Sequence, residues 1–414
     1  MRTLLPILGA ATLIATAVAC GRSTPTPTEW TVTPQRVESP AGANSSEPQL
    51  STSSKGVLLS WIERVGTTTT LKFSERTASG WTTPTAAASG PGWFLSYADV
   101  PSVQRMANGT LAAQFLPTTD DLTEAYDLLV SYSKDEGKTW ATPFMPHHDG
   151  TKTQHGFASM LDMPGGGLGL VWLDGRNSEF KDNDPESGTM TLRFASYDTN
   201  WKQTADVEID HRVCECCQTT AVATADGILT AFRDRDAQEV RDIGVSRLEN
   251  GKWTPTTLVS KDNWMIEGCP VNGPVLAARG REVAAAWFTV KNDQGLSFVA
   301  FSSDAGRTWG APIRVDDAGS LGRVDVDLLE NGSALVSWVE YTEGASDFKV
   351  RRVDKAGTKS PAIAVSPVSG GRASGFPKLA RSGNDVIFAW SGSATPEGDA
   401  GGSLQVFTAV ATLP

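Results

Sequence analysis

Cysteine and histidine, whose side chains bind metal ions and carry out redox chemistry, are few in this sequence, and they are grouped. Apart from Cys20, all of them fall in three consecutive segments, 147–155, 211–217 and 265–269: His147, His148, His155, His211, Cys214, Cys216, Cys217 and Cys269. The three segments occupy equivalent connections of a sequence repeat, and equivalent connections of neighbouring repeats lie side by side in the fold. We therefore expect the segments to meet in one sector of the molecule. The sequence therefore predicts a single Cys- and His-rich site.

Three interpretations of these cysteines remain open at this stage. In an oxidising compartment, Cys214, Cys216, Cys217 and Cys269 would pair as disulfides, and three pairings are compatible with the sequence. Thiolates and imidazoles are also the ligands that copper(I) and zinc prefer, with His155 and His211 as candidate additional ligands. A redox-active set of thiols is the third interpretation. The spacing C-x-C-C matches no standard zinc-site pattern, so the spacing alone does not decide between them.

The elements that must position these segments recur about every 50 residues. Each copy centres on a short apolar run that is preceded by a small-residue strand and followed by a third strand; the seven runs are 56–63, 109–116, 167–174, 227–234, 282–288, 333–340 and 385–392. Four strands per repeat, with small residues on the first, are typical of the blades of a β-propeller. The sequence therefore predicts an all-β propeller of seven four-stranded blades.

The last repeat runs out of chain after its third strand. The segment 30–39 carries the T-P-x-x-V pattern of the fourth strands, so we expect it to complete the last blade. Pairing the N-terminal strand with the C-terminal blade closes the ring and removes a free sheet edge.

Two turns of the repeat share the pattern S-x-D-x-G-x-T-W, at 133–140 and 302–309. In such a turn the Asp carboxylate accepts backbone N–H groups, the Gly adopts a positive φ, and the Trp ring packs back onto the sheet. This is the Asp-box pattern, and through it the sequence resembles the sialidase/BNR-repeat β-propellers. Sialidases have six blades, so a six-bladed ring is the alternative. We expect a structural role for the residues of both turns: Asp135, Gly137, Trp140, Asp304, Gly306 and Trp309.

The resemblance implies a glycoside hydrolase site made of three arginines, a Tyr nucleophile with a Glu partner, and an Asp acid. The candidates in this chain are Tyr341, Glu340, Asp99, Arg212, Arg323 and Arg372. The F/Y-R-I-P motif that carries the first arginine of sialidases is absent. We therefore expect no efficient sialidase activity, and an exo-α-sialidase-type hydrolase stays an alternative.

The N-terminus has the pattern of a lipoprotein signal. Met1 and Arg2 precede an apolar run over 4–19, and Cys20 follows directly. This predicts a signal peptide at 1–19, lipidation of Cys20, a polar tether at 20–28 and the propeller at 29–414. An ordinary signal peptide is the alternative. We expect an exported protein anchored by lipid in a bacterial envelope, in the outer membrane if the source has one.

The formal net charge of −11 and the lack of a basic cluster argue against nucleic acid as a partner. The combined hypothesis is a membrane-anchored, sialidase-like propeller that binds a ligand through its Cys- and His-rich sector. The expected ligand is a copper or zinc ion or a glycan. A protein-interaction scaffold is the remaining alternative.

Overall fold

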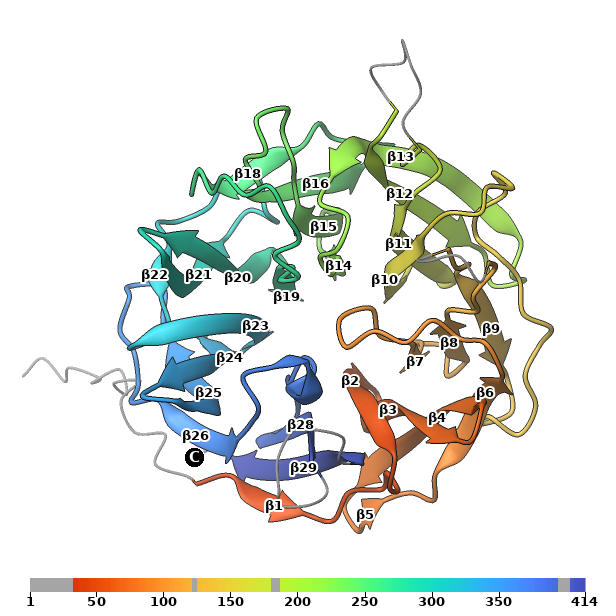
Figure 1. Ribbon diagram of the computed structural model, residues 1–414, viewed down its shortest axis with the longest axis horizontal. Coiled ribbons are helices and arrows are strands. Elements are labelled where there is room, and N and C mark those ends of the chain that lie inside the picture. The colour runs from red at the N-terminus through yellow and green to blue at the C-terminus, as the bar shows by residue number, and fades with distance from the viewer. Residues whose placement is uncertain (1–32, 121–124, 180–186, 394–402, 414) are drawn as a thin grey trace, which may run out of the picture.

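The computed structural model describes residues 33–120, 125–179, 187–393 and 403–413. Within these ranges the chain forms seven antiparallel sheets arranged in a ring around a central axis (Figure 1). The predicted seven-bladed propeller is therefore confirmed. The helical structure in the described ranges is one 3-10 turn, η1 (Arg372–Ser374), and no helix there is long and apolar enough to span a bilayer. The predicted signal peptide, the tether and Cys20 lie outside the described residues.

The first four blades run in chain order from β2 to β18. Blade 1 contains β2 (Ser45–Ser53), β3 (Gly56–Val65), β4 (Thr68–Thr77), β5 (Gly80–Trp81) and β6 (Thr85–Gly90). Blade 2 contains β7 (Ser102–Arg105), β8 (Leu111–Phe115) and β9 (Leu129–Ser133). Blade 3 contains β10 (His155–Asp162), β11 (Leu168–Asp174), β12 (Met190–Tyr197) and β13 (Gln203–Val213). Blade 4 contains β14 (Thr220–Thr224), β15 (Gly227–Arg233), β16 (Ile243–Glu249), β17 (Lys252–Trp253) and β18 (Thr257–Ser260).

The last three blades complete the ring. Blade 5 contains β19 (Val275–Arg279), β20 (Glu282–Lys291), β21 (Gln294–Ser302) and β22 (Ile313–Arg314). Blade 6 contains β23 (Gly319–Leu328), β24 (Ala334–Thr342), β25 (Ala345–Val353) and β26 (Ile363–Pro367). Blade 7 contains β27 (Lys378–Ser382), β28 (Asp385–Ser393), β29 (Leu404–Thr412) and the N-terminal strand β1 (Gln35–Val37).

Ring closure follows the sequence prediction. β1 pairs antiparallel with β29, with Arg36 opposite Ala409. The guanidinium of Arg36 lies 4.2 Å from the ring centroid of Phe407, which adds a cation–π contact to the strand pairing. The two ends of the chain are thereby joined in one blade.

The second strand of each blade is packed between neighbouring blades, which explains its unbroken apolar pattern. Five blades place a tryptophan at the same position of this strand, and all five side chains are buried: Trp61, Trp172, Trp287, Trp338 and Trp390. Blade 2 differs, because its fourth strand is reduced to a bridge between Val130 and Phe144. Pro143 precedes Phe144 and has no N–H to continue the ladder.

The two S-x-D-x-G-x-T-W turns are held by their own carboxylates. Asp135 accepts a 2.9 Å bond from the N–H of Thr139, and Asp304 accepts one of 2.9 Å from the N–H of Thr308. Gly306 has φ +80°, and a Cβ atom there would lie 2.7 Å from Leu229 of the preceding blade. The turns therefore act as contacts between blades, and their two tryptophans are only partly buried.

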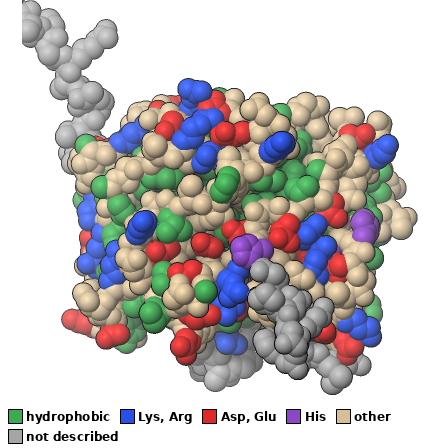
Figure 2. Space-filling model, turned by 90° about the horizontal axis from the view of Figure 1, so that it is seen from above, with side chains coloured by type: hydrophobic (Ala, Val, Ile, Leu, Met, Phe, Trp, Pro, Cys, Tyr) green, Lys and Arg blue, Asp and Glu red, His purple; other side chains and the backbone are tan. Residues whose placement is uncertain are grey.

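Acidic and basic side chains are interspersed on the side of the ring that Figure 2 displays. Ion pairs also join neighbouring blades. Arg105, for example, is buried and binds Glu75 of blade 1.

Candidate functional site

A cavity of about 1090 Å³ is formed by the connections between blades. Residues from blade 1, from blade 7 and from the loops that lead into blades 2 to 5 line it: Glu47, Arg64, Phe94, Tyr97, Lys152, Glu215, Cys216, Cys269 and Arg372 are among them. Two of the three Cys- and His-bearing segments thus bring a cysteine to one cavity. The third segment contributes Lys152 to Gln154.

Three cysteine sulfurs meet at the end of β13. The Sγ of Cys214 lies 3.4 Å from that of Cys217 and 3.8 Å from that of Cys216, and all three lie within 4.8 Å of one another. Cys214 and Cys217 are buried, whereas Cys216 is partly exposed and lines the cavity. The loop is fixed at its start because the N–H of Cys214 donates to the carbonyl oxygen of Arg233 on β15.

Polar donors surround these sulfurs. Nη1 of Arg241 donates to the Sγ of Cys214 at 3.2 Å, and the N–H of Asn272 donates to the Sγ of Cys217 at 3.4 Å. The hydrogen bonds from Cys216 and Cys217 hold the pKa of the Cys214 thiol well below its usual value. Burial raises the pKa of Cys217. The cluster therefore favours one thiolate shared among three sulfurs.

Cys269 lies apart from this cluster. It sits on the loop between β18 and β19, its side chain is exposed, and it lines the same cavity as Cys216. In the described chain all four of these cysteines are free, and no sulfur contact joins Cys269 to the other three.

The histidines do not join the cysteines. The rings of His147 and His155 stack on each other, with centroids 3.8 Å apart and planes 4° apart. Nε2 of His155 lies 3.2 Å from Asp149, and Arg176 binds Asp174 at 2.7 Å and approaches Asp149 at 3.4 Å. Burial and the neighbouring His155 lower the pKa of His147 to about 4. These carboxylates and imidazoles are close enough to hold a metal ion, and Asp149 and Asp174 already share the guanidinium of Arg176.

His211 is an exposed residue near the end of β13. His148 is exposed as well and contacts Gln203. Neither side chain is part of a described group of potential metal ligands.

The sialidase-like candidates do not assemble at one point. Tyr341 is 50% exposed, whereas Glu340 is buried and bound by Lys349 and by the indole N–H of Trp338. Among the residues that line the cavity, neither of these two appears, and Arg212 is also absent.

The guanidinium groups of Arg323 and Arg372 lie 6.0 and 5.6 Å from the ring centroid of Tyr97. Arg372 and Tyr97 line the cavity. Arg323 is buried and donates to the backbone carbonyl oxygens of Gly370 and Gly371. The structure therefore brings two of the three predicted arginines close to one aromatic ring.

Asp99, the predicted acid, is buried beside the cavity. It accepts hydrogen bonds from the hydroxyl of Tyr126 at 2.6 Å and from the N–H of Phe157 at 2.7 Å. Burial raises the pKa of Asp99 to about 7 in spite of these bonds.

Glu47 is a cavity residue that the sequence analysis missed. It has φ +56°, its side chain is 8% exposed, and one carboxyl oxygen, Oε2, has no hydrogen-bond partner. Burial and the nearby Asp99 raise the pKa of Glu47 to about 8. A charged residue within a first strand, directly before Pro48, is the sequence signal that could have identified it.

Glu47 belongs to a pattern that three blades share. β2, β10 and β23 each contain a bulge, and each bulge holds one non-glycine residue with positive φ: Glu47, Phe157 and Arg323. A bulge re-aims a side chain at the cost of local backbone strain. Two of these three side chains, Glu47 and Phe157, line the cavity.

No protein-family model and no curated protein matches this sequence. Among solved structures, a protein of unknown function from Dyadobacter fermentans aligns with a TM-score of 0.50 and 14% identity, over 92% of this chain and 98% of its own. The polysaccharide lyase Uly1 aligns with a TM-score of 0.50 and 10% identity, over 89% and 90%. The NanB sialidase of Streptococcus pneumoniae aligns with a TM-score of 0.47 and 10% identity, over 86% and 83%. At these identities, the two alignments with a TM-score of 0.50 show the fold alone.

Proposed function

We propose that this protein is an exported, lipid-anchored β-propeller that binds a thiophilic metal ion, Cu⁺ or Zn²⁺, through Cys214, Cys216 and Cys217. The spacing of the three sulfurs carries the proposal. Metal–sulfur bonds of about 2.3 Å place ligand sulfurs about 3.8 to 4.0 Å apart in tetrahedral or trigonal sites. The Cys214–Cys216 separation of 3.8 Å fits this range, and the Cys214–Cys217 separation of 3.4 Å would widen by a few tenths of an ångström on binding.

The surroundings of the cluster support the same proposal. A metal-binding cysteine must lose its proton, and donors aimed at the sulfur stabilise the thiolate. Arg241 and the backbone of Asn272 supply such donors to Cys214 and Cys217. Cys216 faces the cavity, which gives an ion a route to the two buried sulfurs.

The test is metal loading of the reduced protein. We expect one ion per chain in the wild type and its loss in Cys214→Ser, with His155→Ala and His211→Ala unaffected because these histidines lie elsewhere. A wild-type protein that carries two disulfides, and takes up no ion after they are reduced, would rule the proposal out in favour of structural cross-links.

A second candidate function rests on Glu47 and its cavity. A protonated carboxyl group beside an aromatic ring and a guanidinium suits a saccharide, whose glycosidic oxygen needs a proton donor for hydrolysis. Glu47 lines the same cavity as Tyr97 and Arg372, and the Arg372 guanidinium lies 5.6 Å from the Tyr97 ring centroid. A panel of fluorogenic glycosides, including an α-sialoside, tests this function, and turnover that Glu47→Gln abolishes would support it. No turnover of any glycoside in the panel would count against it.

A further inference from the structure

We infer that Cys269 is a receiving ligand, which takes Cu⁺ at the surface and passes it to the buried cysteines through Cys216. This inference rests on the proposed metal-binding function and assigns the ion and its path. The sequence offers Cys269 as an equal member of a four-cysteine cluster. Its position in the structure instead separates it from the other three.

The cysteine side chains form a series of decreasing exposure. Cys269, on the loop between β18 and β19, is exposed. Cys216 is partly buried, and Cys214 and Cys217 are 1% and 2% exposed. A soft ion that moves along this series passes from water to a site that excludes water.

The cavity joins the outer and inner parts of this series. Cys269 and Cys216 both line it, so a ligand exchange between them needs no passage through the protein interior. Three residues beyond Cys269, the N–H of Asn272 donates to the sulfur of Cys217 at 3.4 Å. Because three residues of extended chain span at most about 11 Å, Cys269 stays within short reach of the cluster.

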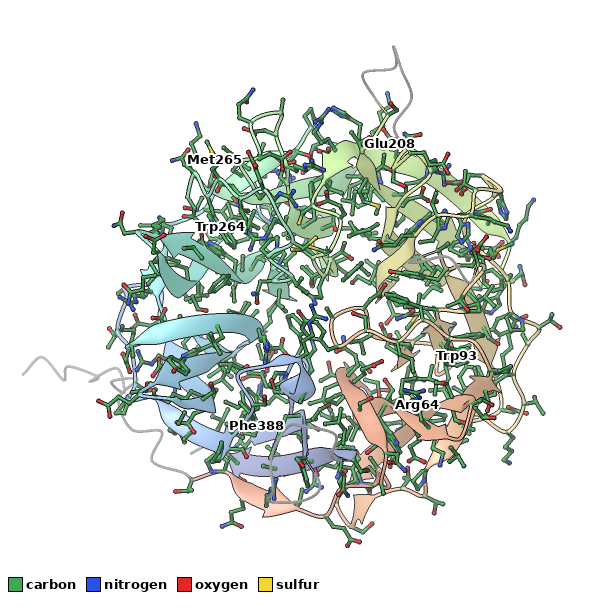
Figure 3. All side chains as sticks on the ribbon, viewed as in Figure 1. Arg64, Trp93, Glu208, Trp264, Met265 and Phe388 are labelled. Carbon is green, nitrogen blue, oxygen red and sulfur yellow. The ribbon has the colours of Figure 1, made fainter. Side chains whose placement is uncertain are left out.

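The loop is anchored at its other end as well. The N–H of Ile266 donates to the carbonyl oxygen of Glu239, and Met265 forms a bridge with Val240. Figure 3 places Met265 towards the outer part of the ring, next to Trp264. Trp264 is buried against Phe288. The exposed Met265 therefore has no part in the packing that fixes its neighbour.

The donor set favours Cu⁺ over Zn²⁺. Zinc sites in proteins are almost always four-coordinate, whereas three thiolate sulfurs satisfy Cu⁺. Cys269 therefore need not remain bound. In each exchange one copper–sulfur bond forms and another breaks. The arriving cysteine releases its proton to solvent, the departing one takes a proton back, and copper remains Cu⁺ throughout.

Loading kinetics test the inference, with the Cu⁺ complex of glutathione as the donor under anaerobic conditions. We expect Cys269→Ser to slow loading about tenfold while the final stoichiometry and the affinity stay within about twofold of wild type. Met265→Leu, at an exposed methionine of the same loop that does not line the cavity, should load like the wild type. Met145→Leu, at a methionine that is 40% exposed in another loop, is the matched control and should load like the wild type.

Three results would overturn the inference. An affinity loss in Cys269→Ser as large as that in Cys214→Ser would make Cys269 a permanent ligand. An unchanged loading rate in Cys269→Ser would show that the ion takes another route. A wild-type protein that binds no metal would overturn the proposed function itself. Because Cys269 is exposed, its variant should melt at the wild-type temperature, which separates these outcomes from a folding defect.

Discussion

Arg241 donates a hydrogen bond to the sulfur of Cys214 over 3.2 Å. The same guanidinium binds the carboxylates of Glu215 and Glu239, which also hold Arg235. The cysteine loop is thereby connected to the loop between β15 and β16 by a network in which one arginine touches sulfur and the other does not. This difference allows the role of the contact to be tested.

Arg241→Gln should weaken metal binding about 10- to 100-fold, the usual effect of removing a donor to a metal ligand. Arg235→Gln removes the same charge from the same carboxylates but leaves the sulfur contact in place. We expect it to change the affinity by less than about threefold. Competition with a chromophoric Cu⁺ chelator measures the dissociation constants of both variants. Equal losses in the two variants would show that the network acts through overall charge instead.

Glu47 makes stability depend on pH. Its pKa rises from 4.5 to about 8 on folding, so the folded state binds more protons than the unfolded state between these values. The resulting stabilisation is complete below about pH 4.5 and is lost as the pH rises through about 8, with a magnitude on the order of a few kcal/mol. Asp99 acts in the same direction, because its pKa rises to about 7.

Glu47→Gln should flatten the dependence of stability on pH. At pH 9 the variant should unfold at a higher urea concentration than the wild type. Urea unfolding of both proteins at several pH values between 5 and 9 measures the effect. Parallel pH profiles for the two proteins would contradict the assignment.

Gly306→Ala should destabilise the propeller through a clash between blades. An added Cβ atom would lie 2.7 Å from Leu229, in a backbone with φ +80°. Gly251→Ala is the matched control, because Gly251 has φ +76° with no atom within 4 Å of a Cβ. We expect the free energy of unfolding to fall by about 1 kcal/mol in the control and by a further 1 to 3 kcal/mol in Gly306→Ala. Chemical denaturation provides both values, and equal losses would mean that Leu229 moves aside freely.

Lipidation of Cys20 remains a prediction from the sequence. Mass spectrometry of the mature protein should find an N-terminal Cys20 that carries acyl chains, and the protein should partition with membranes. Cys20→Ser should release it in a soluble, uncleaved or differently cleaved form. A wild-type protein whose N-terminus is unmodified would refute the anchor.

The sequence repeat predicted the propeller ring because the repeated pattern reflects how the strands pack. The second strands are buried on both sides, and this constraint appears in the sequence as apolar runs with a tryptophan at a fixed position. The closing strand was predictable for a similar reason, since its T-P-x-x-V pattern matches that of the other outer strands. The meeting of Cys214, Cys216 and Cys217 follows from their closeness in the chain.

The rest of the site depends on interactions that the sequence pattern does not carry. Tyr341 and Glu340 are adjacent on β24, so their side chains point to opposite faces and cannot act together. His155 turns towards Asp149 and Asp174 because Arg176 gathers these carboxylates within blade 3 and its loops. Glu47 reaches the cavity through a bulge in which its φ is positive, and the only trace of this bulge in the sequence is a charged residue directly before Pro48 in a first strand.

X-ray absorption at the copper edge of the Cu⁺-loaded protein is the decisive test of the three-cysteine site. We expect one ion per chain with three sulfur neighbours at about 2.2 to 2.3 Å, and the loss of this signal in Cys214→Ser. A first shell of nitrogen and oxygen atoms, or a reduced wild-type protein that takes up no copper, would contradict it.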